Sequence, residues 1–242
     1  MELTILAAGK SSRIYQKIKK PKCLILIKKK TLIEKLILNC EKAKIKKISI
    51  ITGFKSNLIK QKLKKIKKIN YYYNSQFNKK DMMHSFYLAL KNIDDDILIS
   101  YSDILYNHEI LKNIKKHKKN EILLPINKNW LNVWKKRNKN ILNDGESLEI
   151  DNKNYLREIG LKIIKNKIPT YQYMGIIFIP KNLRENLIKI YKSVSKKNSK
   201  MHITKFLNLL IKKNFSIKCI KSNSEWYEFD DYEDFENYKN DN

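Results

Sequence analysis

Small residues, hydroxyl side chains and cations follow one another closely in residues 3–22, LTILAAGKSSRIYQKIKKPK. An apolar run ends in the small residues 7–9, Ala-Ala-Gly, and Arg13 and Lys22 lie farther along the same segment. Small residues allow backbone N–H groups to approach phosphate oxygens, and the two cations can neutralise the remaining negative charge. We therefore expect this segment to hold a polyphosphate in a loop between a strand and a helix.

Two better-known phosphate-binding loops do not fit this segment. A P-loop requires a glycine five residues before the glycine of its Gly-Lys-Ser ending, whereas this chain has Thr4 at that position. The sequence also contains no G-x-G-x-x-G pattern, which disfavours a dinucleotide-binding loop. An ordinary strand-to-helix turn is the remaining alternative. The order of loop, arginine and lysine within one short stretch favours the phosphate site.

A carboxylate, Asp103, ends the apolar segment 97–102, ILISYS. If this segment and residues 2–8 are parallel strands, Asp103 and the loop at 7–13 meet at the carboxyl edge of one sheet, where open α/β sheets bind ligands. Mg²⁺ prefers one or two carboxylates together with phosphate oxygens. The alternative is an aspartate that caps the following helix. The nearby phosphate loop favours a metal ligand.

A second group of carboxylates lies in residues 225–236, EWYEFDDYEDFE, which hold seven acidic residues in twelve positions. Asp230 follows the alternating segment 226–229 and is predicted to end a strand, as Asp103 does, so we expect it to be the second metal ligand. The remaining acids are expected to form the acidic first turn of a helix on the surface, namely Asp231, Glu233, Asp234 and Glu236.

Strand-like and helix-like segments alternate along the chain, which predicts an α/β protein with a Rossmann-like, mostly parallel (mixed) central sheet flanked by helices. Strands are expected at 2–8, 47–52, 69–73, 97–102, 121–126, 147–150, 155–164, 172–179, 215–221 and 226–229. Helices are expected at 31–43, 56–66, 82–92, 107–118, 181–195 and 201–213, and from Asp231 onward. We expect residues 1–242 to form a single domain with a nucleotide-binding half, 1–126, and an acceptor-binding half, 127–242, in which the middle third, 127–170, covers the site as an insertion.

The charge of the chain admits a second interpretation. The 52 lysines and arginines outnumber the 24 acidic residues, which gives a net charge of +28. Such a balance is typical of proteins that bind nucleic acid, and tyrosines 71–73 could stack on bases. Lysine is spread along nearly the whole chain, however, and the scarcity of glycine and proline is typical of an AT-rich genome. We therefore favour solvated lysines over a specific nucleic-acid partner.

The three cysteines show neither metal-ligand spacing nor a disulfide framework, which indicates a reducing, cytoplasmic setting. No apolar run reaches transmembrane length, and the apolar amino-terminal segment is too short for a signal peptide. We expect a cytoplasmic protein without a membrane partner that is a monomer or a homodimer.

Further motifs follow the first loop in a recognisable order. They are Asn74, DMMHSFYLA (81–89), SYSDILY (100–106), NWLNVWKKR (129–137), DGESL (144–148), EIGLK (158–162), QYMGI (172–176), Met201 with Thr204, and EWYEFDDYEDFENY (225–238). Together with LAAGKSSR and the later Pro-Lys pair, they resemble the nucleotidyltransferases, whose fold is shared by MobA-like and sugar nucleotidyltransferases. The resemblance is closest to the cytidylyltransferases that activate phosphocholine or 2-aminoethylphosphonate. It spans nearly the whole chain.

The resemblance implies a role for each matching position. The nucleotide would be bound by Leu6, Ala7, Ala8, Gly9, Lys10, Ser11, Ser12, Arg13, Lys22, Met83, His84, Ser85 and Asp103, with Asn74 near the nucleoside. The acceptor would be bound by Trp130, Trp134, Asp144, Glu146, Lys162 and Tyr173. Arg13, Lys22 and Lys162 would act in catalysis, and Asp103 and Asp230 would hold the Mg²⁺ cofactor.

The two tryptophans also support an acceptor site on physical grounds. Trp130 and Trp134 are four residues apart, so a helix would place both on one face. Aromatic faces attract ammonium groups, at about 0.5–2 kcal/mol per contact. A pair of core tryptophans is the alternative. The implied reaction joins CMP from CTP to a phospho- or phosphono-compound and releases pyrophosphate, with a sugar 1-phosphate as the alternative acceptor.

Overall fold

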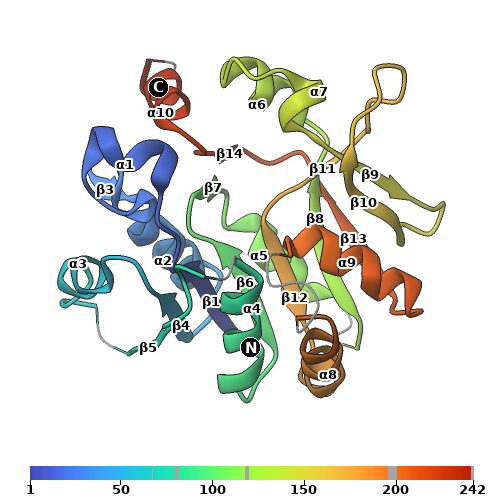
Figure 1. Cartoon of the computed structure of the whole chain (residues 1–242), viewed down its shortest axis with the longest axis horizontal. Helices are drawn as coiled ribbons and strands as arrows, with labels where there is room; N and C mark the ends of the chain where they lie inside the picture. Colours follow the sequence, from blue (N-terminus) through green and yellow to red (C-terminus); the bar gives the residue numbers. More distant parts are fainter. Residues whose placement is uncertain (67, 80–81, 118–119, 196–200, 241–242) are drawn as a thin grey trace.

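The computed structural model describes all residues except 67, 80–81, 118–119, 196–200 and 241–242. An eight-stranded mixed sheet forms its centre, in the order β11-β8-β12-β6-β1-β4-β5, with β13 also paired to β8 (Figure 1). Its strands are β1 (Glu2–Ala7), β4 (Lys47–Thr52), β5 (Ile69–Tyr73), β6 (Ile97–Tyr101), β8 (Ile122–Asn127), β11 (Gln172–Tyr173), β12 (Ile176–Ile179) and β13 (Ile217–Ser222). The pairs β1–β4, β1–β6, β4–β5 and β8–β13 are parallel, and β12 and β11 run antiparallel to their neighbours. The predicted fold class is confirmed.

Helices lie on both faces of this sheet, and α6 (Trp130–Lys136) and α7 (Ile141–Asp144) lie outside it. The other α-helices of the described residues are α1 (Ser12–Ile18), α2 (Leu32–Lys42), α3 (Ser56–Lys62), α4 (Met82–Asn92), α5 (Glu109–Lys116), α8 (Arg184–Ser195), α9 (Ile203–Lys212) and α10 (Tyr232–Asn240). Two apolar cores result: Leu3 and Ile5 of β1 pack with α2 and α5, whereas Leu6 packs with α4, α8 and α9. Because successive strand residues point to opposite faces, β1 contributes to both cores. None of the described helices is long and apolar enough to cross a membrane.

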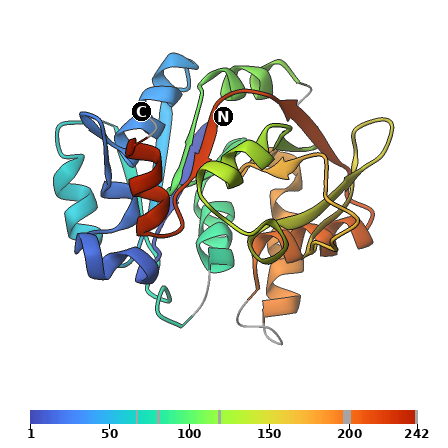
Figure 2. The same cartoon turned by 90° about the horizontal axis from the view of Figure 1, so that it is seen from above.

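Short strands outside the central sheet carry the connections that matter for the site. They are β2 (Leu26–Ile27) with β3 (Lys30–Thr31), β7 (Ile104–Tyr106) with β14 (Trp226–Glu228), and β9 (Glu146–Ile150) with β10 (Leu156–Lys162). The β7–β14 pair is antiparallel. It brings the end of the chain back across the molecule, so that α10 lies beside α1 (Figures 1 and 2). The segment 127–170 forms α6, α7 and the β9–β10 hairpin, away from the central sheet.

Most predicted elements are present within a few residues of their expected bounds. The strands at 47–52 and 69–73 and the helix at 82–92 match in full. The helix expected at 31–43 begins after Thr31, which forms a capping box with Glu34. The sequence analysis did not predict β7 or α1, and the helix expected at 56–66 ends at Lys62.

The single strand expected at 172–179 was wrong, because Gly175 divides it into β11 and β12. Gly175 has a φ of +75°, a conformation that residues with a Cβ atom adopt only with strain. A Cβ atom there would also lie 3.0 Å from Cδ2 of Tyr101. The backbone carbonyl of Gly175 accepts a hydrogen bond from the N–H of Tyr101 at 2.9 Å, so this bend is tied to the end of β6.

We expect Gly175→Ala to lower the free energy of unfolding by about 1–2 kcal/mol, which is the cost of a left-handed conformation for a residue with a Cβ atom. Gly9→Ala is the matched control, because no atom lies within 4 Å of the added methyl group and the φ of Gly9 is not in the left-handed region. Urea unfolding of both variants measures the difference. Equal stability of the two variants would contradict the role given to Gly175.

Candidate active site

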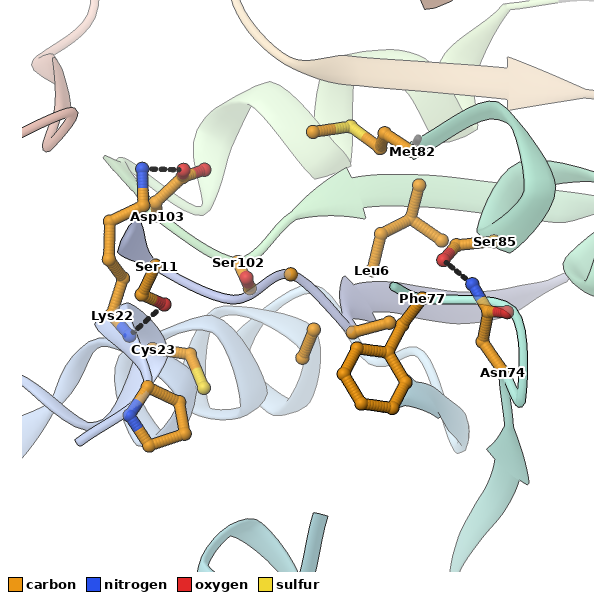
Figure 3. Close-up of a pocket in the computed structure, with 14 residues that line it drawn as sticks. Leu6, Ser11, Lys22, Cys23, Asn74, Phe77, Met82, Ser85, Ser102 and Asp103 are labelled. Atoms are coloured by element: carbon orange, nitrogen blue, oxygen red, sulfur yellow. Dashed lines mark hydrogen bonds and ion pairs between the residues drawn. The ribbon is translucent and has the colours of Figure 1, made fainter. Parts of the chain in front are cut away.

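Two strands deliver the predicted phosphate loop and Asp103 to the same edge of the sheet. β1 and β6 are parallel, with Leu6 opposite Tyr101, so the residues that follow each strand emerge side by side. They border a cavity of about 220 Å³ (Figure 3). Its lining consists of Leu6, Ala7, Ala8, Gly9, Ser11, Pro21, Lys22, Cys23, Asn74, Phe77, Met82, Ser85, Ser102 and Asp103.

The loop after β1 keeps its backbone open toward this cavity. Gly9 has no neighbouring atom within 4 Å of where a Cβ would stand. Ser11 adopts a left-handed conformation, with a φ of 56°, and caps the short helix α1. Its hydroxyl accepts a hydrogen bond from the backbone N–H of Lys22 at 2.9 Å, which ties the loop to the later lysine. The predicted loop and its second cation therefore form one local unit.

The ammonium of Lys22 lies between the two predicted metal ligands. Its Nζ atom is 2.6 Å from Oδ2 of Asp103 and 3.6 Å from Oδ1 of Asp230. Burial alone would lower the pKa of Lys22, but the charges of Asp103 and Asp230 outweigh burial and raise it. Burial would likewise raise the pKa of Asp230, but Lys22, Arg13 and Arg137 hold it below its usual value. Both groups are therefore charged at neutral pH.

The donor set around this ammonium suits a hard divalent cation. Two aspartates surround one positive charge, and carboxylate oxygens are the protein ligands that Mg²⁺ prefers. Within the described part of the chain, no group of three or more histidine, cysteine or acidic side chains is placed to hold a metal by itself. Phosphate oxygens and water would therefore have to complete the coordination of a Mg²⁺ ion here, which is how proteins usually bind this ion.

A buried arginine that the sequence analysis did not single out fixes Asp230 from behind. Arg137 has no exposed surface, and its guanidinium lies over the Trp134 ring at 4.7 Å. Its Nη2 donates to Asp230 at 3.0 Å, and Nε and Nη2 both donate to Asp234, at 3.0 and 3.1 Å. Burial opposes its charge, but the hydrogen bonds with Asp234 and the nearby acids raise the pKa of Arg137 further above its usual range. Arg137 ends the motif NWLNVWKKR and is one of only four arginines in the chain, so the available signal was an arginine within a family motif.

The expectation that Asp234 lies on the surface was wrong. Its side chain has no exposed surface, and its Oδ2 accepts hydrogen bonds from the backbone N–H groups of Asp230 at 2.6 Å and Asp231 at 3.2 Å. Asp234 therefore fixes the backbone of Asp230 while Arg137 fixes its side chain. The carboxylates of 225–236 form an ordered turn and not only a helix surface.

A second cavity, of about 250 Å³, adjoins the first. Met82 lines both cavities. Asp103 of the first cavity and Asp230 of the second contact the same ammonium group, that of Lys22. The second cavity is lined by Arg13, Met82, Tyr101, Trp134, Asp144, Glu146, Gln172, Tyr173, Gly175, His202, Ile203, Thr204, Glu228 and Asp230. It thus collects four carboxylates in a chain with a large excess of positive charge.

Three of these carboxylates are more easily protonated than usual. Burial raises the pKa of Asp144 and of Glu146. Burial and then the charge of Asp230 raise the pKa of Glu228 well above its ordinary value. From the sequence, Glu228 was expected only as a strand residue. The strand pattern of 226–229 was the available signal for a site residue, because side chains two apart in a strand, such as Glu228 and Asp230, point to the same side.

Several predicted site residues do not line either cavity. Met83 is buried and its neighbour Met82 takes the cavity position. His84 instead contacts the Tyr191 hydroxyl at 3.1 Å. Lys10 and Ser12 are exposed and are not among the lining residues of the first cavity.

The predicted acceptor residues lie in three different places. Trp134, Asp144, Glu146 and Tyr173 line the second cavity. Trp130 instead is a core residue without exposed surface, and its indole N–H donates to the carbonyl of Pro169 at 3.0 Å. Lys162 lies at the end of β10 and lines a hollow of the β9–β10 hairpin. Placing these two side chains at the acceptor is therefore not supported by the structure.

Comparisons with known proteins support the fold. The nucleotidyl transferase family model matches residues 3–127. A CTP:phosphoglutamine cytidylyltransferase of Campylobacter jejuni is 30% identical over 250 residues, with 98% of each chain covered. Two solved structures share the fold. The inositol-1-phosphate CTP transferase of T. maritima has a TM-score of 0.78 at 16% identity, covering 98% of this chain and 94% of that one. The phosphocholine cytidylyltransferase of Streptococcus pneumoniae has a TM-score of 0.74 at 16% sequence identity, and the match covers 99% of this chain and 97% of that one.

We expect Arg137→Met to lower the free energy of unfolding by about 3–5 kcal/mol, because it leaves buried carboxylates without their cation. The loss should be smaller at pH 5 than at pH 7. Without the guanidinium the acids have raised pKa values in the folded state, so protonation as the pH falls relieves their repulsion. Urea unfolding at both pH values measures the effect. Lys135→Met, on the exposed face of the same helix, is the control and should stay within about 0.5 kcal/mol. If Arg137→Met were as stable as Lys135→Met, the role assigned to Arg137 would be contradicted.

Proposed function

The chain belongs to the nucleotidyl transferase family, and from this premise we propose that it transfers CMP from CTP to a small phosphorylated or phosphonate acceptor and releases pyrophosphate. The observation that carries the proposal is the ion group at the junction of the two cavities, where Lys22 lies between Asp103 and Asp230. One cavity adjoins the small-residue loop and suits a nucleotide, and the other is acidic and suits a second substrate. The cytidine nucleotide is supported by the relative at 30% identity, whose name includes CTP.

The reaction requires little of the protein beyond positioning and charge neutralisation. A phosphate oxygen of the acceptor attacks the α-phosphorus of the nucleotide, the bond from that phosphorus to the bridging oxygen of the β-phosphate breaks, and pyrophosphate leaves with the electron pair. The attacking group is already an anion, so no general base is required. Lys22 and Arg13 both contact Oδ1 of Asp230, and they are placed to neutralise phosphate charge and to align the reactants.

We further propose that the transfer depends on Mg²⁺ held by Asp103 and Asp230. Once bound, the ion would neutralise the charge on the phosphates, which disfavours attack by a second anion. The two aspartates come from the ends of β6 and β14, and the second is held by Arg137. This arrangement orients both carboxylates before a nucleotide arrives.

For the acceptor we propose a headgroup that carries an ammonium. Asp144 and Glu146 supply negative charge to the second cavity, and Tyr173 and Trp134 supply aromatic surface. Carboxylates and aromatic faces both attract ammonium groups. The acceptors named for two of the similar proteins, phosphoglutamine and phosphocholine, both carry such a group. A sugar phosphate has no positive charge for these carboxylates to bind.

Pyrophosphate release tests the proposed reaction directly. The assay pairs each of the four nucleoside triphosphates with phosphoglutamine, phosphocholine, 2-aminoethylphosphonate and sugar 1-phosphates. We expect turnover with CTP and an ammonium-bearing acceptor, and a decrease of at least about 100-fold in kcat for Asp103→Asn or Asp230→Asn. Glu109→Gln, an exposed acid on α5, is the control and should retain full activity. Turnover only with sugar phosphates would contradict the acceptor class, and active Asp103→Asn and Asp230→Asn variants would contradict the metal site.

The acidic cavity predicts a pH dependence of acceptor binding. Glu146 is half-buried beside Thr204 and His202, and this burial raises its pKa above the ordinary value of 4.5. As the pH falls through this raised pKa, Glu146 takes up a proton, and we expect the KM of an ammonium-bearing acceptor to rise while the KM of CTP changes less. Glu146→Gln should raise the acceptor KM about tenfold at neutral pH and reduce its pH dependence. Glu149→Gln, an exposed acid on the same strand, is the control. A wild-type pH profile in Glu146→Gln would contradict this role.

A further inference from the structure

The first cavity has two chemically different ends. Figure 3 shows Lys22 and Asp103 at one end and Asn74, Ser85 and Phe77 at the other. The charged end suits the phosphates of a nucleotide. The other end contains no charged lining residue, and its largest flat side chain is Phe77. It is therefore the end at which a nucleobase would lie.

Phe77 is held in a defined turn that begins directly after β5. The side-chain oxygen of Asn74 accepts a hydrogen bond from the backbone N–H of Gln76 at 2.9 Å, and its amide donates to the Ser85 hydroxyl at 2.9 Å. The backbone N–H of Phe77 donates to the carbonyl of Asn74 at 3.4 Å. Asn74 thus links the turn to α4, and both polar groups of its side chain are used within the protein.

A missing Cβ atom lets Phe77 approach the phosphate loop closely. A Cβ atom on Gly53 would lie 2.8 Å from the carbonyl oxygen of Ala8 and 2.9 Å from the Cβ of Phe77, which is closer than such atoms can come. Ala8, Gly53 and Asn74 directly follow β1, β4 and β5, which are neighbours in the sheet. Any side chain at position 53 would force the loop and the turn apart.

Other aromatic rings support Phe77 from outside the cavity. Its ring centre is 6.3 Å from that of Phe54, which in turn is 5.1 Å from Tyr15 of α1 in an edge-to-face arrangement. Tyr73 approaches the same ring at 6.4 Å. Phe54 is not among the residues that line the cavity, so it supports the wall without forming it. The ring of Phe77 is therefore fixed on several sides.

We infer that Phe77 stacks on the base of the nucleotide and that Gly53 positions it there. This inference rests on the proposed nucleotidyl transfer and adds to it a residue that holds the base. Base-aromatic stacking tolerates any base, so Phe77 contributes affinity for the nucleotide and does not by itself choose among bases.

Nucleotide binding measured without any acceptor tests this inference. Isothermal titration calorimetry with Mg²⁺ gives the Kd of CTP and of inorganic triphosphate for the full chain and for four variants. We expect Phe77→Leu, which keeps bulk but removes the flat ring, and Phe77→Ala, which removes the side chain beyond Cβ, each to weaken CTP binding about tenfold. Inorganic triphosphate has no base, so its Kd should change less than about twofold in both variants.

Phe54→Leu is the matched control, because leucine keeps apolar bulk behind Phe77 and leaves the cavity lining unchanged, and it should shift the Kd of CTP less than about twofold. Gly53→Ala should weaken CTP binding although Gly53 does not touch the cavity, which a purely local role could not explain. An unchanged Kd of CTP in both Phe77 variants, or an equal loss of affinity for CTP and for triphosphate, would overturn the inference. Base-dependent nucleotide binding without pyrophosphate release would instead refute the proposed transfer and leave the role of Phe77 supported.

Discussion

Charge balance around Lys22 is the constraint on which the rest of the site depends. Its ammonium contacts carboxylates that follow β6 and β14, and Lys22 itself follows the amino-terminal loop. In a partly buried place, opposite charges attract strongly, but each loses the water that would otherwise stabilise it. Asp103 and Asp230 can lie together as anions only while a cation lies between them. The ion group therefore joins three segments that are far apart in the sequence.

Bringing Asp230 to this place requires the chain to return from β13 to the amino-terminal half. Pairing of β14 with β7 guides the return, and Arg137 and Asp234 fix the turn that follows. A buried arginine with bidentate contacts suits this task better than a lysine, because its planar guanidinium holds several carboxylate oxygens in fixed directions. The cost of burying these charges is offset because each has its partner. The position of Asp230 is thus set mainly by contacts outside the reacting centre.

The sequence predicted those parts of the site that local patterns determine. The loop at 7–13, Asp103 and Asp230 each follow an apolar run, and parallel strands bring such positions to one edge. It did not predict Arg137 or Phe77, because their roles come from contacts with residues distant in the sequence and neither belongs to a periodic pattern. Trp130 and Trp134 share a helix, yet only Trp134 lines the cavity. Trp130 is instead held in the core, where its indole N–H donates to the carbonyl of Pro169. Gly175 broke a predicted strand for the same kind of reason, because its neighbour in space is Tyr101.

The two proposed substrates require protein groups of opposite charge in neighbouring cavities, cations for the triphosphate and carboxylates for the ammonium of the acceptor. A chain with a net charge of +28 attracts a triphosphate over its whole surface, but salt screens such attraction beyond about 8 Å at physiological ionic strength. The choice of a second substrate must then come from nearby groups, and Asp144 and Glu146 line the second cavity with negative charge. Arg13 and Lys22 contact Asp230 between the two cavities, so they separate the proposed phosphate site from the cavity lined by carboxylates. An acceptor with a phosphate at one end and an ammonium at the other matches this change of charge. Its phosphate would then lie at the junction of the two cavities, where the proposed transfer would take place.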